Sequence, residues 1–87
     1  MLKRVCVSAL TKEQWRQVRY LIRFSQADWA ALFGVTHRVV GRWESGDTPV
    51  PLMADHLLRF ILSDDRIRVK LLSDSALYVA LSEKGIL

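Results

Sequence analysis

The charged side chains of this sequence include 13 lysines and arginines against nine acidic residues, and the cations are unevenly distributed. Residues 1–46 contain eight lysines and arginines against three acidic residues, whereas residues 47–87 contain five against six. A cationic half is typical of a chain that binds a polyanion, because each neutralised phosphate releases condensed counterions. The same charges also suit a solvated face that only maintains solubility. Charge alone leaves both interpretations open.

Residues suited to catalysis or metal binding are few. The chain has one cysteine, Cys6, and two histidines, His37 and His56, whose spacing fits no zinc motif. No histidine lies near a paired carboxylate in the sequence, there is no glycine-rich phosphate loop, and Ser25 is explained as a helix cap. We therefore expect no enzyme activity, no cofactor and no metal site.

Length and hydropathy indicate one domain outside the membrane. The 87 residues, 51% of them hydrophobic, suffice for a single core. No apolar stretch approaches the roughly 18 residues of a membrane span. The apolar residues after Lys3 and Arg4 are too few for a secretory signal. We expect a single domain over residues 1–87, located in the cytoplasm.

Capping signals and apolar spacing predict a first helix near the N-terminus. Thr11 and Gln14 fit a capping box, which predicts a helix from residue 12 to about Arg23. Its apolar stripe comprises Trp15, Val18, Leu21 and Ile22.

Two short helices are expected next, joined by a glycine turn. Ser25, with Asp28 three residues later, caps the first of them, and Gly34 ends it in the left-handed conformation. Thr36 restarts helical structure, which stops at Gly46. Helices joined by so short a turn cross steeply. The residues expected on their buried faces are Trp29, Ala30, Phe33, Val39, Val40 and Trp43.

The second half of the chain predicts two further helices. Pro51 suits the first position of a fourth helix, and Asp64 and Asp65 are expected to begin a fifth. The apolar residues assigned to them are Leu52, Leu57, Leu58, Ile61, Leu62, Ile67, Val69, Leu71 and Leu72.

The two ends of the chain are less easily assigned. Residues 1–10 alternate in a way that suits a short strand, whereas periodicity cannot assign the apolar run Leu77–Leu81 within residues 74–87. Both ends, together with the fifth helix, are candidate dimerisation elements. The alternating apolar residues are Val5, Val7 and Ala9.

Several of these residues together resemble the lambda-repressor and Cro family of helix-turn-helix regulators, also called the xenobiotic-response-element family. The resemblance covers about Val18 to Leu62, with its motif core at residues 25–46, and implies an all-α, five-helix fold. Because different residue types agree over a fixed length, the match is more specific than a lone glycine between helices. The matching segments are Ser25-Gln26, Trp29-Ala30, Gly34-Val35-Thr36 and Glu44-Ser45-Gly46.

The resemblance implies a DNA-binding face. The recognition helix, residues 36–45, would lie in the major groove, where either Arg38 or Arg42 can contact guanine through two hydrogen bonds. Thr36 and Gln26, at two helix N-termini, would touch phosphates. The residues implied to contact base edges are His37, Arg38, Gly41 and Arg42.

Two further positions follow from the same resemblance. Arg19 is expected to pair with Glu44, which would tie the first helix to the end of the third. Asp47 departs from the family, where many relatives have a basic residue near the DNA backbone. Its carboxylate would repel phosphate. Either the loop stands away from the duplex, with the acid capping a neighbouring amide, or the affinity for DNA is modest and depends on dimerisation.

The function expected from these features is sequence-specific binding of duplex DNA by a small regulator, an autorepressor of the prophage or toxin–antitoxin type. A homodimer would bind an inverted repeat with half-sites about 34 Å apart. The alternative is an antitoxin or adaptor whose main role is to bind a protein partner such as a toxin. A helix-turn-helix that packs only against protein also stays open.

Overall fold

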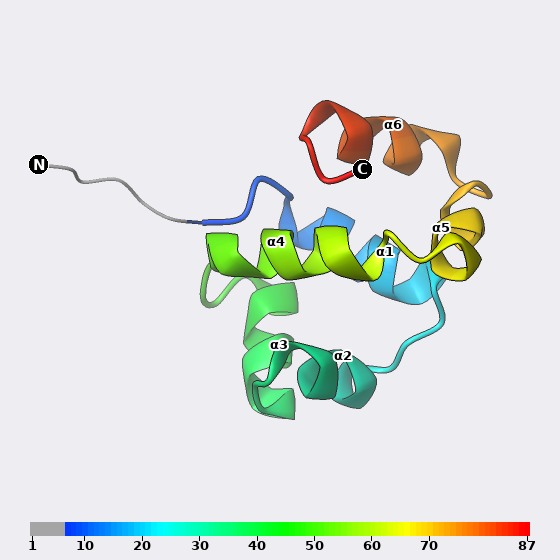
Figure 1. Cartoon of the computed structure of the whole chain (residues 1–87). Coiled ribbons are helices and arrows are strands. Elements are labelled where there is room, and N and C mark those ends of the chain that lie inside the picture. The colour runs from blue at the N-terminus through cyan, green and yellow to red at the C-terminus, as the bar shows by residue number, and fades with distance from the viewer. Residues whose placement is uncertain (1–6) are drawn as a thin grey trace, which may run out of the picture.

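The computed structural model describes residues 7–87, which form six α-helices and no strand (Figure 1). The all-helical class is confirmed. The expected number of five helices is wrong, because the C-terminal segment forms a sixth. The helices are α1 (Lys12–Leu21), α2 (Gln26–Phe33), α3 (His37–Ser45), α4 (Leu52–Ile61), α5 (Asp65–Leu71) and α6 (Ser75–Glu83).

The start of α1 follows its sequence signal and its end does not. The Thr11 hydroxyl accepts from the Gln14 amide and the Gln14 side chain accepts from the Thr11 amide, so the capping box is confirmed. The helix ends at Leu21 rather than near Arg23, because Arg23 has a φ of 64° in the left-handed region. The chain there turns towards α2.

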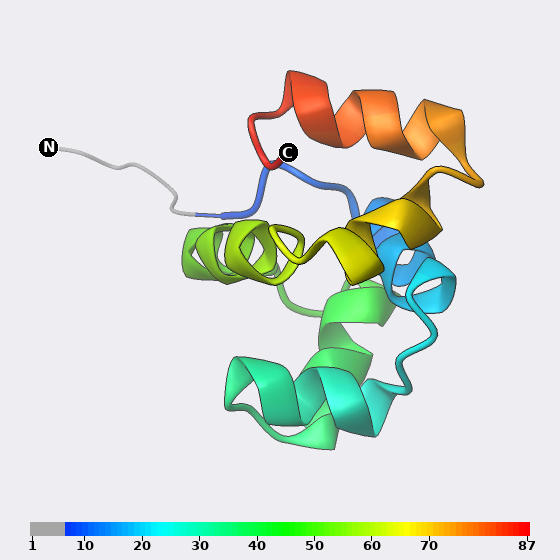
Figure 2. The same ribbon diagram turned by 45° about the vertical axis from the view of Figure 1, so that its right-hand side comes forward.

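A three-residue turn joins α2 to α3. Ser25 and Asp28 form the second capping box, and Gly34 ends α2 with a φ of 70°. The Thr36 hydroxyl accepts from the Val39 amide and begins α3, which Gly46 ends with a φ of 89°. The two helices cross steeply in both views (Figures 1 and 2).

The segment before α1 runs beside the start of α4 without forming a strand. Val7 makes one isolated antiparallel bridge with Pro51, and the Ser8 amide donates to the Val50 carbonyl at 2.7 Å. The expected strand is therefore wrong for residues 7–10, while Val5 lies outside the described residues. Pro51 is the N-cap of α4 rather than its first helical residue.

The core extends between the helices and draws residues from each of them, including the three tryptophans. Trp15 and Trp29 are 1% exposed and Trp43 is 6% exposed, so the expectation that all three lie on the packed faces of their helices is confirmed. Val40 and Ala30 are also buried, as expected. Other buried core residues are Leu10, Val18, Ile22, Val50, Ala54, Leu58, Leu62, Leu71, Leu77, Leu81 and Ile86.

Aromatic rings join the first three helices. The Trp15 and Trp29 rings meet edge to face at 6.0 Å, and Phe33 stacks on Trp29 at 5.0 Å. Phe33 also lies 5.6 Å from Trp15 and 5.9 Å from Trp43. Such pairs stabilise by about 0.5–1.5 kcal/mol each beyond the apolar area they bury. The cluster therefore fixes α2 and α3 against α1.

The C-terminal helix α6 lies on the far side of α1, α4 and α5 from α2 and α3 (Figures 1 and 2). Leu77 and Leu81 are 4% and 0% exposed, so both ends of the run considered for dimerisation belong to this protein's own core. Val79 stays exposed. Lys84, just beyond α6, donates to the Ala9 carbonyl at 2.7 Å. None of the helices within residues 7–87 has the length and apolar character needed to cross a bilayer.

Candidate nucleic-acid interface

The outer face of α3 forms a shallow hollow of about 500 Å³. Five of the six residues expected to meet DNA line it, and the sixth, Thr36, is the N-cap residue of α3. The structure thus brings the expected residues together on one surface. The lining residues are Gln26, His37, Arg38, Gly41, Arg42, Ser45 and Asp47.

Helical spacing explains why these side chains point outward. Val40 and Trp43 are buried against the core, with 0% and 6% exposure. His37, Arg38 and Arg42 lie on the opposite side and are exposed. Residues three and four apart share a helix face, so one side of α3 packs and the other meets solvent.

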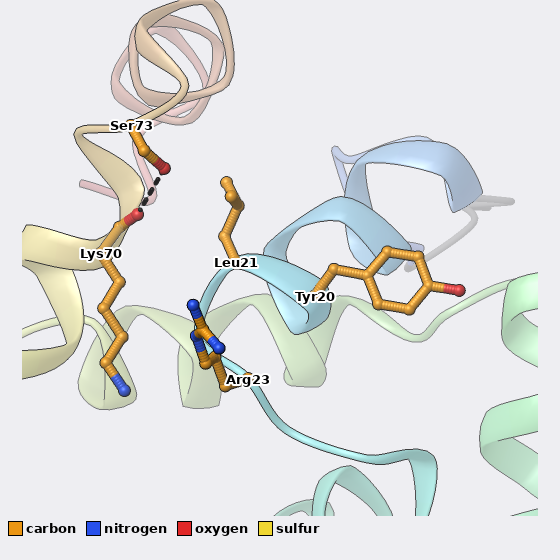
Figure 3. A pocket seen from close by; sticks show the side chains of 5 residues that line it. All are labelled: Tyr20, Leu21, Arg23, Lys70 and Ser73. Atoms are coloured by element: carbon orange, nitrogen blue, oxygen red, sulfur yellow. Dashed lines mark hydrogen bonds between the residues drawn. The ribbon is translucent and has the colours of Figure 1, made fainter.

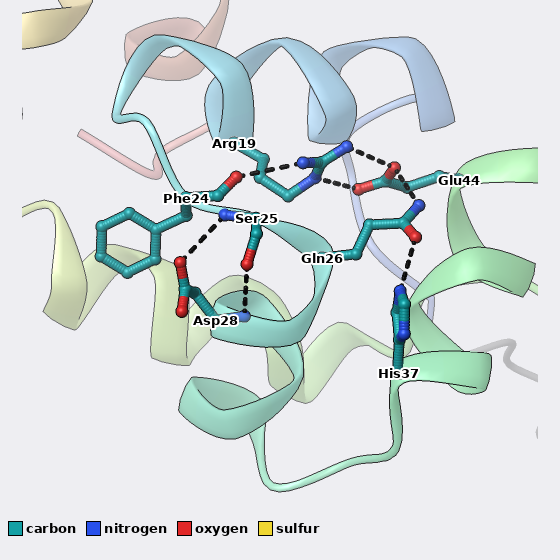
Figure 4. Close-up of polar contacts among 7 residues, drawn as sticks. All are labelled: Arg19, Phe24, Ser25, Gln26, Asp28, His37 and Glu44. Carbon is teal, nitrogen blue, oxygen red and sulfur yellow. Dashed lines mark hydrogen bonds and ion pairs between the residues drawn. The ribbon is translucent and has the colours of Figure 1, made fainter.

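A buried ion pair ties this helix to α1. Arg19 Nε donates to Glu44 Oε2 at 2.6 Å and its Nη2 donates to Oε1 at 2.9 Å (Figure 4). The third donor, Nη1, reaches the Phe24 carbonyl at 3.0 Å, and the guanidinium lies 4.7 Å from the Tyr20 ring centre. The pair implied by the family resemblance is therefore present, with both side chains under 10% exposed.

The ion pair determines the protonation of both partners. Burial raises the pKa of Glu44, but hydrogen bonds from Arg19 and Gln26 and the charges of Arg19 and Arg16 together hold it below its ordinary value. The hydrogen bond to Glu44 raises the pKa of Arg19 against the opposing effect of burial. Glu44 is therefore a carboxylate at neutral pH, with acceptors only.

Gln26 extends this pair to the surface of α3. Its Nε2 donates to Glu44 Oε1 at 3.0 Å, and its Oε1 lies 2.9 Å from His37 Nε2 (Figure 4). Gln26 and His37 were expected on the DNA-binding face, but neither of these two contacts was predicted. Gln26 is separated from His37 by 11 positions and from Glu44 by 18 positions in the sequence. Gln26 therefore positions His37 on the exposed face of α3.

Gly41 leaves the middle of the hollow open. A methyl group at its Cα would meet no atom within 4 Å, and its φ is not in the left-handed region. Neither the fold nor the backbone therefore requires glycine here. The absence of a side chain does leave open space on the surface of α3 between Arg38 and Arg42.

Asp47 brings a carboxylate to the rim of the same hollow. It is exposed, and among residues 7–87 no hydrogen bond to its side chain is present, although its amide donates to Ser45 Oγ at 3.4 Å. The alternative in which Asp47 caps a neighbouring amide is therefore wrong. Its negative charge lies close to the cations of α3.

The chain matches no family model, no curated protein and no solved structure. The chemistry of the α3 face must therefore be argued from its own geometry. It offers two guanidinium groups and an imidazole, with open space at Gly41. Guanidinium groups donate hydrogen bonds and an imidazole can donate or accept them, which is chemistry that base edges and phosphates can engage.

A second polar hollow, also of about 500 Å³, lies between the end of α1 and the end of α5 (Figure 3). Arg23 and Lys70 contribute cations to it, and Ser73 Oγ donates to the Lys70 carbonyl at 3.1 Å. It shares no residue with the α3 hollow. Its lining comes from the ends of two helices rather than from the length of one, so it is a weaker candidate for binding duplex DNA.

One buried polar cluster was not foreseen from the sequence. Asp55 of α4 is 4% exposed and accepts from the Ser8 hydroxyl and from the Ala9 amide at 2.8 Å. Ser8 Oγ in turn accepts from Trp15 Nε1 at 2.8 Å. Every polar atom in the cluster has a partner within the fold. Its role is to attach the N-terminal segment to α1 and α4. No cluster of metal-binding side chains occurs in the part of the chain that the structure describes.

Proposed function

We propose that this protein is a cytoplasmic regulator that binds a specific duplex DNA sequence through the outer face of α3. The observation that carries the proposal is the division of α3 into a buried apolar side and an exposed side with His37, Arg38 and Arg42. On this proposal α2 and α3 are a helix-turn-helix of the lambda-repressor and Cro type. The steep crossing of the two helices and the short turn support it.

The dimensions of DNA suit this helix. The major groove, about 12 Å wide, admits an α-helix, and each base pair presents a distinct pattern of donors and acceptors there. Arg38 and Arg42 can each contact guanine O6 and N7. Thr36, at the N-terminus of α3, is suited to meet a phosphate, because the first-turn amides of a helix attract anions. The gap at Gly41 allows close approach between the two arginines.

A homodimer is the proposed binding unit. One short domain contacts only a few base pairs, and two symmetric copies square the ratio by which the preferred DNA sequence is favoured over others. The fifth helix supports this arrangement. Val69 on α5 is 57% exposed, and Leu72, the C-cap residue directly after the helix, is 58% exposed. Both border a hollow flanked by Asp65 and Arg68. A two-fold axis through that patch would oppose Asp65 of one copy to Arg68 of the other. The apolar and charged groups are then self-complementary.

The second candidate function is binding of another protein, as in an antitoxin or adaptor. An apolar groove of about 480 Å³ beside α4 favours it, because Met53 and Phe60 are 77% and 74% exposed there. Exposed apolar patches of this kind mark interaction surfaces. The expected occupant is an apolar segment of a toxin-like partner. A toxin that co-purifies with the chain should be lost from a Met53→Ser/Phe60→Ser variant and kept by a Val69→Ser/Leu72→Ser variant.

The main proposal is tested by selecting duplexes from a random pool at low salt and sequencing them. We expect an inverted repeat. Arg38→Ala and Arg42→Ala should each relax base preference at one position per half-site, at a cost of about 1–3 kcal/mol. Arg59→Ala removes an exposed arginine on α4 and is the matched control. Failure to enrich any sequence, or an equal effect of Arg59→Ala, would reject the proposal.

The dimer is tested separately by sedimentation of the free protein and of its DNA complex. Val69→Ser/Leu72→Ser should give a monomer that binds half-sites without cooperativity. Met53→Ser/Phe60→Ser should leave the dimer intact. The reverse pattern would move the dimer interface from α5 to α4.

A further inference from the structure

Glu44, Gln26 and His37 form a chain of hydrogen bonds that leads from a buried carboxylate to the DNA-binding face (Figure 4). Glu44 is 5% exposed, Gln26 is half-buried and His37 is exposed. The three residues come from α2 and α3. The state of the innermost group can therefore determine the orientation of the outermost one.

The orientation of the Gln26 amide follows from its partner. The Glu44 carboxylate accepts hydrogen bonds and donates none, so it must face the Gln26 NH₂ group, at 3.0 Å. A reversed amide would place two oxygen acceptors against one another. The Gln26 oxygen is consequently directed at His37.

The same reasoning fixes the tautomer of His37. Its Nε2 lies 2.9 Å from the Gln26 oxygen, which only accepts, so Nε2 carries a hydrogen. In the neutral imidazole the other nitrogen, Nδ1, is then an acceptor. In the imidazolium both nitrogens are donors. No residue between 7 and 87 forms a hydrogen bond with Nδ1, so this atom is available to a ligand in the hollow of α3.

We propose that His37 determines base specificity and that the base it prefers changes with its charge. Neutral His37 accepts at Nδ1 from an exocyclic amino group, adenine N6 or cytosine N4. Protonated His37 donates from Nδ1 to guanine N7 or O6. A histidine without this contact could also donate from Nδ1 in its neutral form, by moving its hydrogen from Nε2 to Nδ1. In His37 the Gln26 oxygen holds the hydrogen on Nε2 and prevents this change. The inference rests on the proposed function and concerns one position within each half-site.

Charged groups of both signs line the hollow that contains His37. Arg38 and Arg42 lie on the same helix, and Asp47 lies on the loop after α3. Behind Gln26, Glu44 is already paired with Arg19. Histidine side chains change charge between about pH 5 and pH 8, so that interval is the one to examine.

The tautomer is tested in the free protein by nitrogen-15 NMR of the imidazole rings. At about pH 8, where histidines are mostly neutral, we expect His37 to carry its hydrogen on Nε2. Gln26→Ala should give a mixture of tautomers, with circular dichroism used to verify that it is folded. His56, on α4 and outside the hollow, is the internal control. A hydrogen on Nδ1 of neutral His37 would overturn the inference.

Specificity is tested by duplex selection at about pH 8 and about pH 5.5, on either side of the histidine range. At the position that His37→Ala relaxes, the preferred base should change from adenine or cytosine to guanine, by about threefold to tenfold in relative affinity. His37→Gln, which does not titrate, should remove the change, and His56→Gln should not. An enriched repeat with the same base at both pH values would overturn this inference alone. No enrichment at either pH would reject the proposed function itself.

Discussion

Arg19 and Glu44 meet 25 positions apart in the chain, with Nε and Oε2 separated by 2.6 Å and both side chains almost fully removed from solvent. The pair joins α1 to the end of α3. On its outer side it also holds Gln26, and through Gln26 it orients His37. One buried contact therefore braces the fold and organises the proposed DNA-binding face.

Glu44→Ala should destabilise the protein strongly. Removing one member of a buried pair leaves the other charge without compensation, at a cost of about 3–5 kcal/mol. Chemical denaturation monitored by circular dichroism would measure this loss. Arg66→Ala is the control, because its ion pair with Asp64 is exposed and should contribute little. Equal stability of Glu44→Ala and the wild type would contradict the structural role of the pair.

The pair also predicts how stability changes in acid. The pKa of Glu44 is lower in the folded protein than in the unfolded chain, so its contribution is complete above the ordinary glutamate value of about 4.3. This contribution to the unfolding free energy is lost as the pH falls through the pKa that Glu44 has in the folded protein. The unfolding free energy of the wild type should therefore decrease below about pH 4.3, more steeply than that of Glu44→Gln. Parallel pH profiles for the two proteins would show that Glu44 does not titrate in this way.

Gly41→Ala should separate folding from DNA binding. The added methyl group meets no atom of the protein, and alanine favours a helix by about 0.5–1 kcal/mol over glycine. We expect a more stable protein whose affinity for its selected duplex falls about tenfold, or 1.4 kcal/mol. Thermal unfolding and fluorescence anisotropy would measure the two effects. Unchanged affinity would mean that glycine is only tolerated at this position.

Asp47→Asn should strengthen DNA binding. The wild-type carboxylate lies at the rim of the hollow, where it would repel phosphate. Removing an exposed charge of this kind should raise affinity about two- to fivefold at low salt. The gain should shrink as salt is added, because screening weakens exposed charges. A Glu83→Gln variant on α6 is the matched control, and an equal gain there would indicate only a general effect of net charge.

The helices could be predicted from sequence where local chemistry specifies them. Helix starts are specified by the hydroxyl groups of Thr11, Ser25 and Thr36, which accept from the amide three residues later. Helix ends are specified by Gly34 and Gly46, which adopt the left-handed conformation. Both effects involve residues close in sequence, so a short stretch of sequence is enough to predict them. The sixth helix was missed because Leu77–Leu81 is apolar on every side, so its periodicity gives no direction. Its capping residue, Asp74, which accepts from the Leu77 amide, was the overlooked signal.

The residues of the candidate site could be predicted from the sequence, but the hydrogen bonds between them could not. Spacing along one helix places His37, Arg38 and Arg42 on a common face, since that relation is local. The contacts of Gln26 with Glu44 and His37 depend on how α2 packs across α3. Periodicity within one helix carries no information about such a contact. The resemblance to known regulators supplied the Arg19–Glu44 pair, which spacing alone would not have given.

The central claim is that the outer face of α3 binds duplex DNA, and amide chemical-shift mapping tests it most directly. A 20-base-pair duplex of mixed sequence would be titrated into nitrogen-15-labelled protein at low salt. We predict the largest shifts at Thr36, His37, Arg38 and Arg42 and at the first turn of α2, with little change in α6. Shifts confined to α4 and α6, or none at all, would contradict it.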